Sequence, residues 1–146
     1  LRQRVGIAHA AVPMLFSCVR GLLRALAWAS SDQLATKSAS GSSSSRVGGL
    51  DLECARNMRR LLEELATHKK ALVRHGAYLL SDLVAVFRSR PLPPAARAEI
   101  VPGVYAFIGM CTEIEIQEVH AASDATARRV LKELLEAYQR SFKFRG

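Results

Sequence analysis

The sequence predicts an all-α fold of about six antiparallel helices, because three of its properties favour helix over strand. Leu, Ala and Arg are abundant, whereas aromatic residues make up only 6% of the chain. Apolar residues recur every three or four positions, and no sustained stretch alternates apolar and polar residues. Such helices suit the end of a HEAT-like α-solenoid or an irregular helical bundle. The sequence shows no clear internal repeat that would decide between the two.

The chain divides into three segments. It has 146 residues and opens on leucine, so we expect a piece of a larger protein. Residues 1–29 are predicted to form an N-terminal packing helix, and residues 50–146 a C-terminal helical domain. Residues 30–49 are rich in serine and glycine and lack any period, which predicts a flexible loop. We therefore expect the first helix to pack on the rest across this tether.

The segment Val5–Ala29 has the general form of a secretory signal. However, Arg20 and Arg24 lie inside its apolar stretch and Pro13 interrupts it, and the uncharged run is too short to span a bilayer. The two arginines share one helical face. The other face is expected to hold Leu15, Val19, Leu22, Leu23 and Leu26. An amphipathic packing helix is the favoured interpretation, with a signal peptide or a membrane-surface anchor as alternatives.

Beyond the loop, the helical period runs over residues 50–68 and again over residues 70–89. Asp51 is the expected N-cap of the first of these helices. Its apolar face is predicted to be Cys54, Met58, Leu61, Leu62 and Leu65. The residues that join the two helices, near position 69, include neither Gly nor Pro. The chain can therefore form either a tight helical hairpin or one continuous helix with a kink.

The last three helices follow a proline-rich stop at residues 90–94. Residues 95–111 form the first of them, and Pro102 predicts a break or kink within it. Thr112 and Glu115 have the spacing of a capping box, which opens a short helix to about residue 121. Asp124 caps the final helix. Its apolar face is predicted to be Ala127, Val130, Leu131, Leu134, Leu135 and Tyr138.

The chain is basic, and its charge is unevenly distributed. The net charge is +8, and residues 1–30 contain four arginines and no acidic residue. The isoelectric point of about 10.0 suits a nucleic-acid environment, because basic surfaces attract phosphate and release counterions. An arginine-rich composition without any such role would give the same balance.

The C-terminal end is the first candidate for binding RNA or a protein partner, because aromatic residues alternate with cations there. Its residues are Arg140, Phe142, Lys143, Phe144 and Arg145. The rings can stack on bases while the cations meet phosphates. Alternatively, Phe142 packs under the last helical turn and the cations complement the helix C-terminus. A secondary basic patch comprises Arg56, Arg59, Arg60, Lys69, Lys70 and Arg74.

No pattern in the sequence is typical of catalysis or of a metal site. The four histidines (His9, His68, His75 and His120) are dispersed, and no phosphate-binding glycine motif occurs. The three cysteines have apolar neighbours and no CxxC spacing, so all are interpreted as buried hydrophobic residues in a reducing compartment. They are Cys18, Cys54 and Cys111. We predict no enzyme, no metal, no cofactor and no small-molecule substrate.

The stretch Pro102–Gly146 resembles the C-terminal domain of the unhealthy ribosome biogenesis protein 2 family. The resemblance rests on the order and spacing of residues that include Pro102, Gly103, Tyr105, Ala106, Cys111, Glu115, Asp124, Tyr138, Lys143 and Phe144. Residues 55–65 and 75–82 look similar too, so the resemblance covers about residues 50–146. The chain departs from the family pattern at Gly109, at Leu135 and in the final aromatic residues.

The resemblance implies a nuclear, nucleolar protein acting in early large-ribosomal-subunit assembly and in the processing of precursor ribosomal RNA. The implied partners are other nucleolar assembly factors, including a DEAD-box RNA helicase, and precursor ribosomal RNA; no membrane is implied. A non-enzymatic scaffold or docking module is the expected role. The alternative is a general HEAT-like protein-interaction domain that is unconnected with RNA.

Overall fold

The computed structural model of the chain describes residues 12–25, 44–72, 75–89 and 92–141. These residues form seven helices and no strand, which confirms the predicted all-α fold. The first helix spans residues 12–25 and is called the N-terminal helix below. The others are α2 (Ser44–Thr67), α3 (Lys69–Leu72), α4 (Gly76–Ser89), α5 (Pro94–Met110), α6 (Glu113–Ala122) and α7 (Ala125–Ser141).

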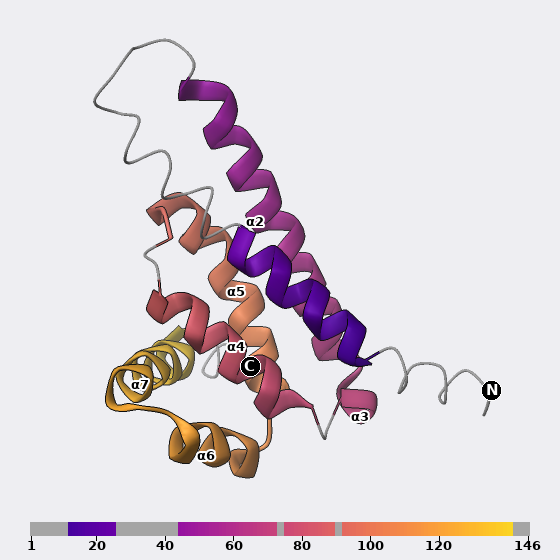
Figure 1. Cartoon of the computed structure of the whole chain (residues 1–146), viewed down its shortest axis with the longest axis vertical. Helices are drawn as coiled ribbons and strands as arrows, with labels where there is room; N and C mark the ends of the chain where they lie inside the picture. The colour runs from indigo at the N-terminus through magenta and orange to yellow at the C-terminus, as the bar shows by residue number, and fades with distance from the viewer. Residues whose placement is uncertain (1–11, 26–43, 73–74, 90–91, 142–146) are drawn as a thin grey trace, which may run out of the picture.

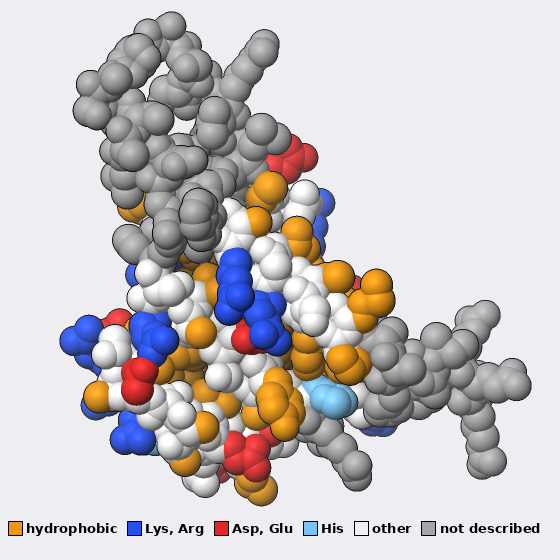
Figure 2. Space-filling model, in the orientation of Figure 1, with side chains coloured by type: hydrophobic (Ala, Val, Ile, Leu, Met, Phe, Trp, Pro, Cys, Tyr) orange, Lys and Arg blue, Asp and Glu red, His pale blue; other side chains and the backbone are white. Residues whose placement is uncertain are grey.

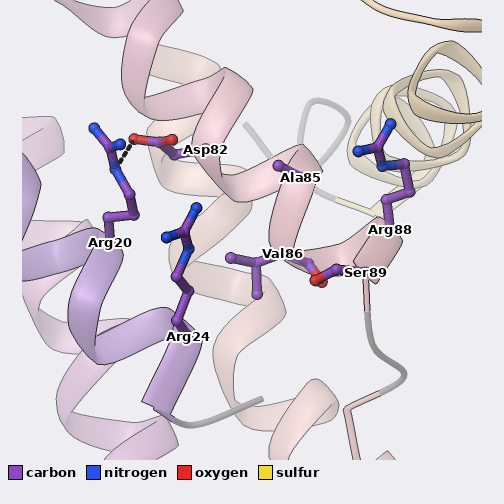
Figure 3. A pocket seen from close by; sticks show the side chains of 7 residues that line it. All are labelled: Arg20, Arg24, Asp82, Ala85, Val86, Arg88 and Ser89. Atoms are coloured by element: carbon purple, nitrogen blue, oxygen red, sulfur yellow. Dashed lines mark hydrogen bonds and ion pairs between the residues drawn. The ribbon is translucent and has the colours of Figure 1, made fainter. Parts of the chain in front are cut away.

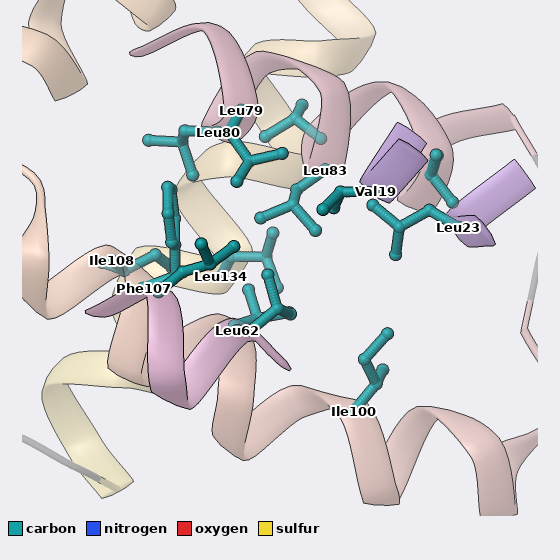
Figure 4. Close-up of a cluster of buried hydrophobic side chains, with 14 of the residues drawn as sticks. Val19, Leu23, Leu62, Leu79, Leu80, Leu83, Ile100, Phe107, Ile108 and Leu134 are labelled. Carbon is teal, nitrogen blue, oxygen red and sulfur yellow. The ribbon is translucent and has the colours of Figure 1, made fainter. Parts of the chain in front are cut away.

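The long helices α2 and α5 form the most extensive helix pair, and α4 packs against α5, α6 and α7 (Figure 1). The N-terminal helix crosses in front of this group, and α6 and α7 lie at its lower end in that view. Side chains from several helices meet in one core, which Figure 4 shows. Leu62 of α2, Leu83 of α4, Phe107 of α5 and Leu134 of α7 all belong to it, as does Leu23 of the N-terminal helix.

The N-terminal helix is an integral part of this core. Its buried residues are Val12, Phe16, Val19 and Leu23, which recur every three or four positions along one face. The prediction that Leu22 also faces inward is wrong, because its side chain is 54% exposed. Leu22 lies one position, and therefore about 100°, from the buried Leu23. Of the other expected inward residues, Leu15 is half-buried and Leu26 lies outside the described residues.

The start of α2 corrects the predicted loop boundary. The helix begins at Ser44, so residues 44–49 are helical and Asp51 lies inside the helix rather than capping it. Extending an existing helix avoids the cost of nucleation, and this outweighs the low helix propensity of serine and glycine. Residues 30–43 lie outside the described part of the chain, so the rest of the loop prediction stays a prediction.

Between α2 and α4 the chain passes through the single turn α3. The predicted start at residue 70 is therefore wrong, since the long helix starts only at Gly76, but its predicted end at residue 89 is confirmed. Backbone bonds from His68 N to Leu65 O (3.1 Å) and from His75 N to Leu72 O (2.8 Å) close the turns on each side of α3. A Cβ atom on Gly76 would lie 2.7 Å from Glu115 Oε1, so α4 and α6 approach closely at this point.

Helix α5 continues through Pro102, so the predicted break at that residue is wrong. The lost backbone hydrogen bond is offset by packing, because Ile100, Val104 and Phe107 are completely buried. A Cβ on Gly103 would lie 2.8 Å from the carbonyl oxygen of Arg59, so α5 touches the α2 backbone directly.

Both predicted caps in the second half of the chain are confirmed. Thr112 and Glu115 form a complete capping box, in which Thr112 N donates to Glu115 Oε2 at 2.7 Å and Glu115 N donates to Thr112 Oγ1 at 3.3 Å. At the start of α7, Ala127 N donates to Asp124 Oδ1 at 2.8 Å. The predicted face of α7 is the one that turns inward, since Ala127 and Leu131 are buried.

The cysteines differ in their surroundings. Cys111 is buried, but Cys18 and Cys54 are exposed, so two of the three predicted burials are wrong. Ala55 takes the buried place expected for Cys54. Burial raises the pKa of the Cys111 thiol to about 12, and the nearby Glu115 charge adds to the rise while Lys69 opposes it.

A thiol-labelling experiment should separate these cysteines. At about pH 8 a maleimide should modify Cys18 and Cys54 in the folded protein and spare Cys111, because the thiolate is the reactive form and Cys111 is both buried and protonated. Mass spectrometry of the labelled chain measures this, with urea-unfolded protein as the control in which all three react. Equal labelling rates at Cys111 and Cys18 in the folded state would contradict the burial of Cys111.

Candidate functional site

The secondary basic patch is partly neutralised in the folded chain. Arg56 Nε lies 3.4 Å from Glu99 Oε1, and Arg59 Nη1 lies 3.7 Å from Glu99 Oε2. Arg59 Nε also donates to Glu63 Oε1 at 2.9 Å. The two ion pairs with Glu99 join α2 to α5, whereas Arg59–Glu63 lies within α2. Of the remaining patch residues, Arg60, Lys69 and Lys70 are exposed, and Arg74 lies outside the described residues.

The C-terminal candidate is described only at its first residue. Arg140 is exposed near the end of α7, and its Nε donates to the Glu136 carbonyl oxygen at 3.3 Å. The bond holds the Arg140 guanidinium against the preceding turn of the helix, where a cation also complements the partial negative charge of the helix C-terminus. Phe142, Lys143, Phe144 and Arg145 lie outside the described residues, so their role stays a prediction.

A third basic site lies between the N-terminal helix and α4, where the fold creates a depression of about 190 Å³ (Figure 3). We call it the arginine depression. It is lined by Arg20, Arg24, Asp82, Ala85, Val86, Arg88 and Ser89. The N-terminal helix contributes the first two arginines from adjacent turns of one face, and α4 contributes the other residues.

The charges around the arginine depression do not cancel. Three arginines face a single lining carboxylate, Asp82, which lies 3.0 Å from Arg20 Nε. Arg88 pairs with Asp124 at the start of α7. Within the described part of the chain, Arg24 has no carboxylate within ion-pair distance. Figure 2 shows cations in the middle of this face, where the N-terminal helix lies beside α4. The depression can therefore attract an anion.

Only one side of the arginine depression could be predicted from the sequence. The spacing of Arg20 and Arg24 predicted their shared face, but Asp82 and Arg88 lie about sixty positions further along the chain. Only the packing of the N-terminal helix on α4 brings the two pairs together. No sequence signal indicated this contact.

Asp124 also makes the stability of the folded chain depend on pH. The hydrogen bond from Ala127 N lowers the pKa of its carboxyl below 3.8, and the Arg88 guanidinium adds to this shift. A lowered folded-state pKa stabilises the protein above the unfolded value, and this contribution is lost as pH falls through the folded value. Asp124→Asn keeps the cap but removes the charge. Wild type should therefore melt above the variant at neutral pH, and the two melting temperatures should converge in acid; a gap that widens in acid would contradict the ion pair.

Two kinds of feature are absent from the described residues. None of the helices described is long and apolar enough to cross a membrane. No group of three His, Cys, Asp or Glu side chains among these residues is arranged to hold a metal ion.

The fold and the surface define a class: an all-helical domain with a basic depression between two of its helices. The chain belongs to the Urb2/Npa2 family, whose model matches residues 1–146. This confirms the resemblance seen in residues 50–146 and extends it over the N-terminal helix. Membership implies a ribosome biogenesis factor associated with the ribosome assembly machinery. No solved structure matches the chain.

Proposed function

We propose that the chain is a non-enzymatic docking module that holds assembly factors on precursor ribosomal RNA during early large-subunit assembly. Its site of action is the nucleolus, and its partners are other nucleolar assembly factors, including a DEAD-box RNA helicase. The arginine depression carries this proposal, because a family of ribosome biogenesis factors works among polyanions and the depression presents unbalanced positive charge.

The ion pairs of α2 support a structural role for part of the basic charge. Arg56 and Arg59 both pair with Glu99, so part of their charge is compensated where α2 meets α5. Groups of cations with less compensation lie elsewhere. These are the arginine depression, the exposed Arg60, Lys69 and Lys70, and the C-terminal group that begins at Arg140.

Affinity purification of the full-length protein from cells tests the proposal. Precursor large-subunit RNA and nucleolar factors should co-purify with the wild-type protein. Deleting the residues of this chain should reduce the recovery of those partners while the remainder of the protein is still expressed. Recovery of vesicle or coat proteins instead would favour the alternative, a HEAT-like interaction domain that is unconnected with RNA.

A further inference from the structure

We infer that the arginine depression binds the phosphodiester backbone of RNA, with Arg24 as its main phosphate contact. This inference rests on the proposed function and assigns it to particular residues. Arg24 lines the depression, is exposed, and has no carboxylate partner among the described residues. An arginine in this state retains all its donors and its full charge for an incoming anion.

Arg20 is held in a position that suits the same ligand. Its Nε lies 3.0 Å from Asp82 Oδ2, and Figure 3 shows both residues at the edge of the depression beside Arg24. Because the ion pair uses Nε, the two terminal nitrogens of Arg20 remain available to donate to a phosphate. Asp82 thus acts as a positioning residue that fixes one guanidinium next to the other.

Arg88 extends the basic surface toward α7. It pairs through Nη1 with Asp124, so it lies on the opposite side of the lining from Arg20 and Arg24 (Figure 3). Arginines placed on both sides of a depression can contact successive phosphates of one strand. Asp82 pairs with Arg20 and Asp124 pairs with Arg88, so Arg24 is the lining arginine whose charge no described carboxylate compensates.

The remaining lining favours a phosphate backbone over a protein segment. Ala85, Val86 and Ser89 are small, and Ser89 Oγ already donates to the Val86 carbonyl oxygen at 3.1 Å. The depression has no aromatic lining residue and no deep apolar pocket, which are the features that anchor a protein partner. Arginines around a small polar hollow are typical of sequence-independent backbone contacts.

The test measures binding of the full chain to a short fluorescent oligouridylate as a function of salt. Arg24→Gln should lower the slope of log K against log salt by about 0.7, the value for one lost phosphate contact on a single strand. Arg129→Gln is the matched control, because it removes the same charge from an exposed position of α7 that does not line the depression. The control should leave the slope unchanged.

Competition with polyglutamate identifies the chemical class of the ligand. At equal charge concentration it should displace the oligouridylate far less well than unlabelled oligouridylate does. Equal displacement would overturn the inference in favour of an acidic protein segment. Equal loss of slope in both variants, or no binding by wild type, would overturn it as well. None of these three results removes the proposed docking function, which fails if precursor RNA and nucleolar factors do not co-purify with the full-length protein or if deleting this chain leaves their recovery unchanged.

Discussion

Leu23→Ala should lower the free energy of unfolding by about 2–5 kcal/mol, because it empties a fully packed position in the core. Leu23 is only 1% exposed, and it lies in the N-terminal helix. Much of the change should therefore come from weaker packing of this helix on the rest of the domain. Chemical denaturation followed by circular dichroism measures it.

Leu22→Ala is the matched control, since it makes the same chemical change one residue away. Leu22 is 54% exposed, and its loss should change stability by no more than about 0.5 kcal/mol. If the two variants were equally stable, the N-terminal helix would not be packed on the core in solution. A larger loss for Leu22→Ala than for Leu23→Ala would mean that the opposite face is buried.

Gly103→Leu should destabilise the domain by about 1–3 kcal/mol through overpacking. Even the first added atom, Cβ, would lie 2.8 Å from the Arg59 carbonyl oxygen and 2.9 Å from the Arg59 Cα. These are backbone atoms of a long helix, so they cannot rotate away as the end of a flexible side chain could. Helices α2 and α5 would have to separate, and thermal melting should show a lower midpoint.

Gly21→Ala should have the opposite effect on stability. A Cβ at Gly21 meets no atom within 4 Å, so the substitution adds helix propensity without a clash. It should stabilise the domain by up to about 1 kcal/mol.

A neutral Gly103→Leu variant would show that α2 and α5 are further apart than the structure places them.

Local signals in the sequence predicted the caps well, because a capping interaction involves residues only three positions apart. The Thr112–Glu115 capping box and the Asp124 cap are both present. The inward face of α7 was also predictable, since its period is unbroken. The start of α2 was not, because the extension of a helix already formed overrides the local preference of Ser and Gly. The continuity of α5 through Pro102 was not, because it depends on packing against other helices.

The candidate site shows the same limit. Arg20 and Arg24 could be placed together from their spacing, but their carboxylate partner could not be identified before the contact with α4 was known. The basic residues of α2 looked equivalent in the sequence. In the fold they differ, because Arg56 and Arg59 form ion pairs with Glu99 of α5, whereas Arg60 is exposed and does not pair with Glu99.

The close approach of α4 and α6 at Gly76 links the folding of two helices that are far apart in the sequence. Glu115 Oε2 completes the capping box, while the buried Oε1 has no hydrogen-bond partner and faces Gly76. When α4 packs against α6, it covers the Glu115 carboxylate, which also caps the start of α6. If either helix unfolds, the contact between Gly76 and Glu115 is lost. We expect the amide protons of α4 and α6 to exchange as one cooperative unit, whose opening energy a side chain at residue 76 would lower.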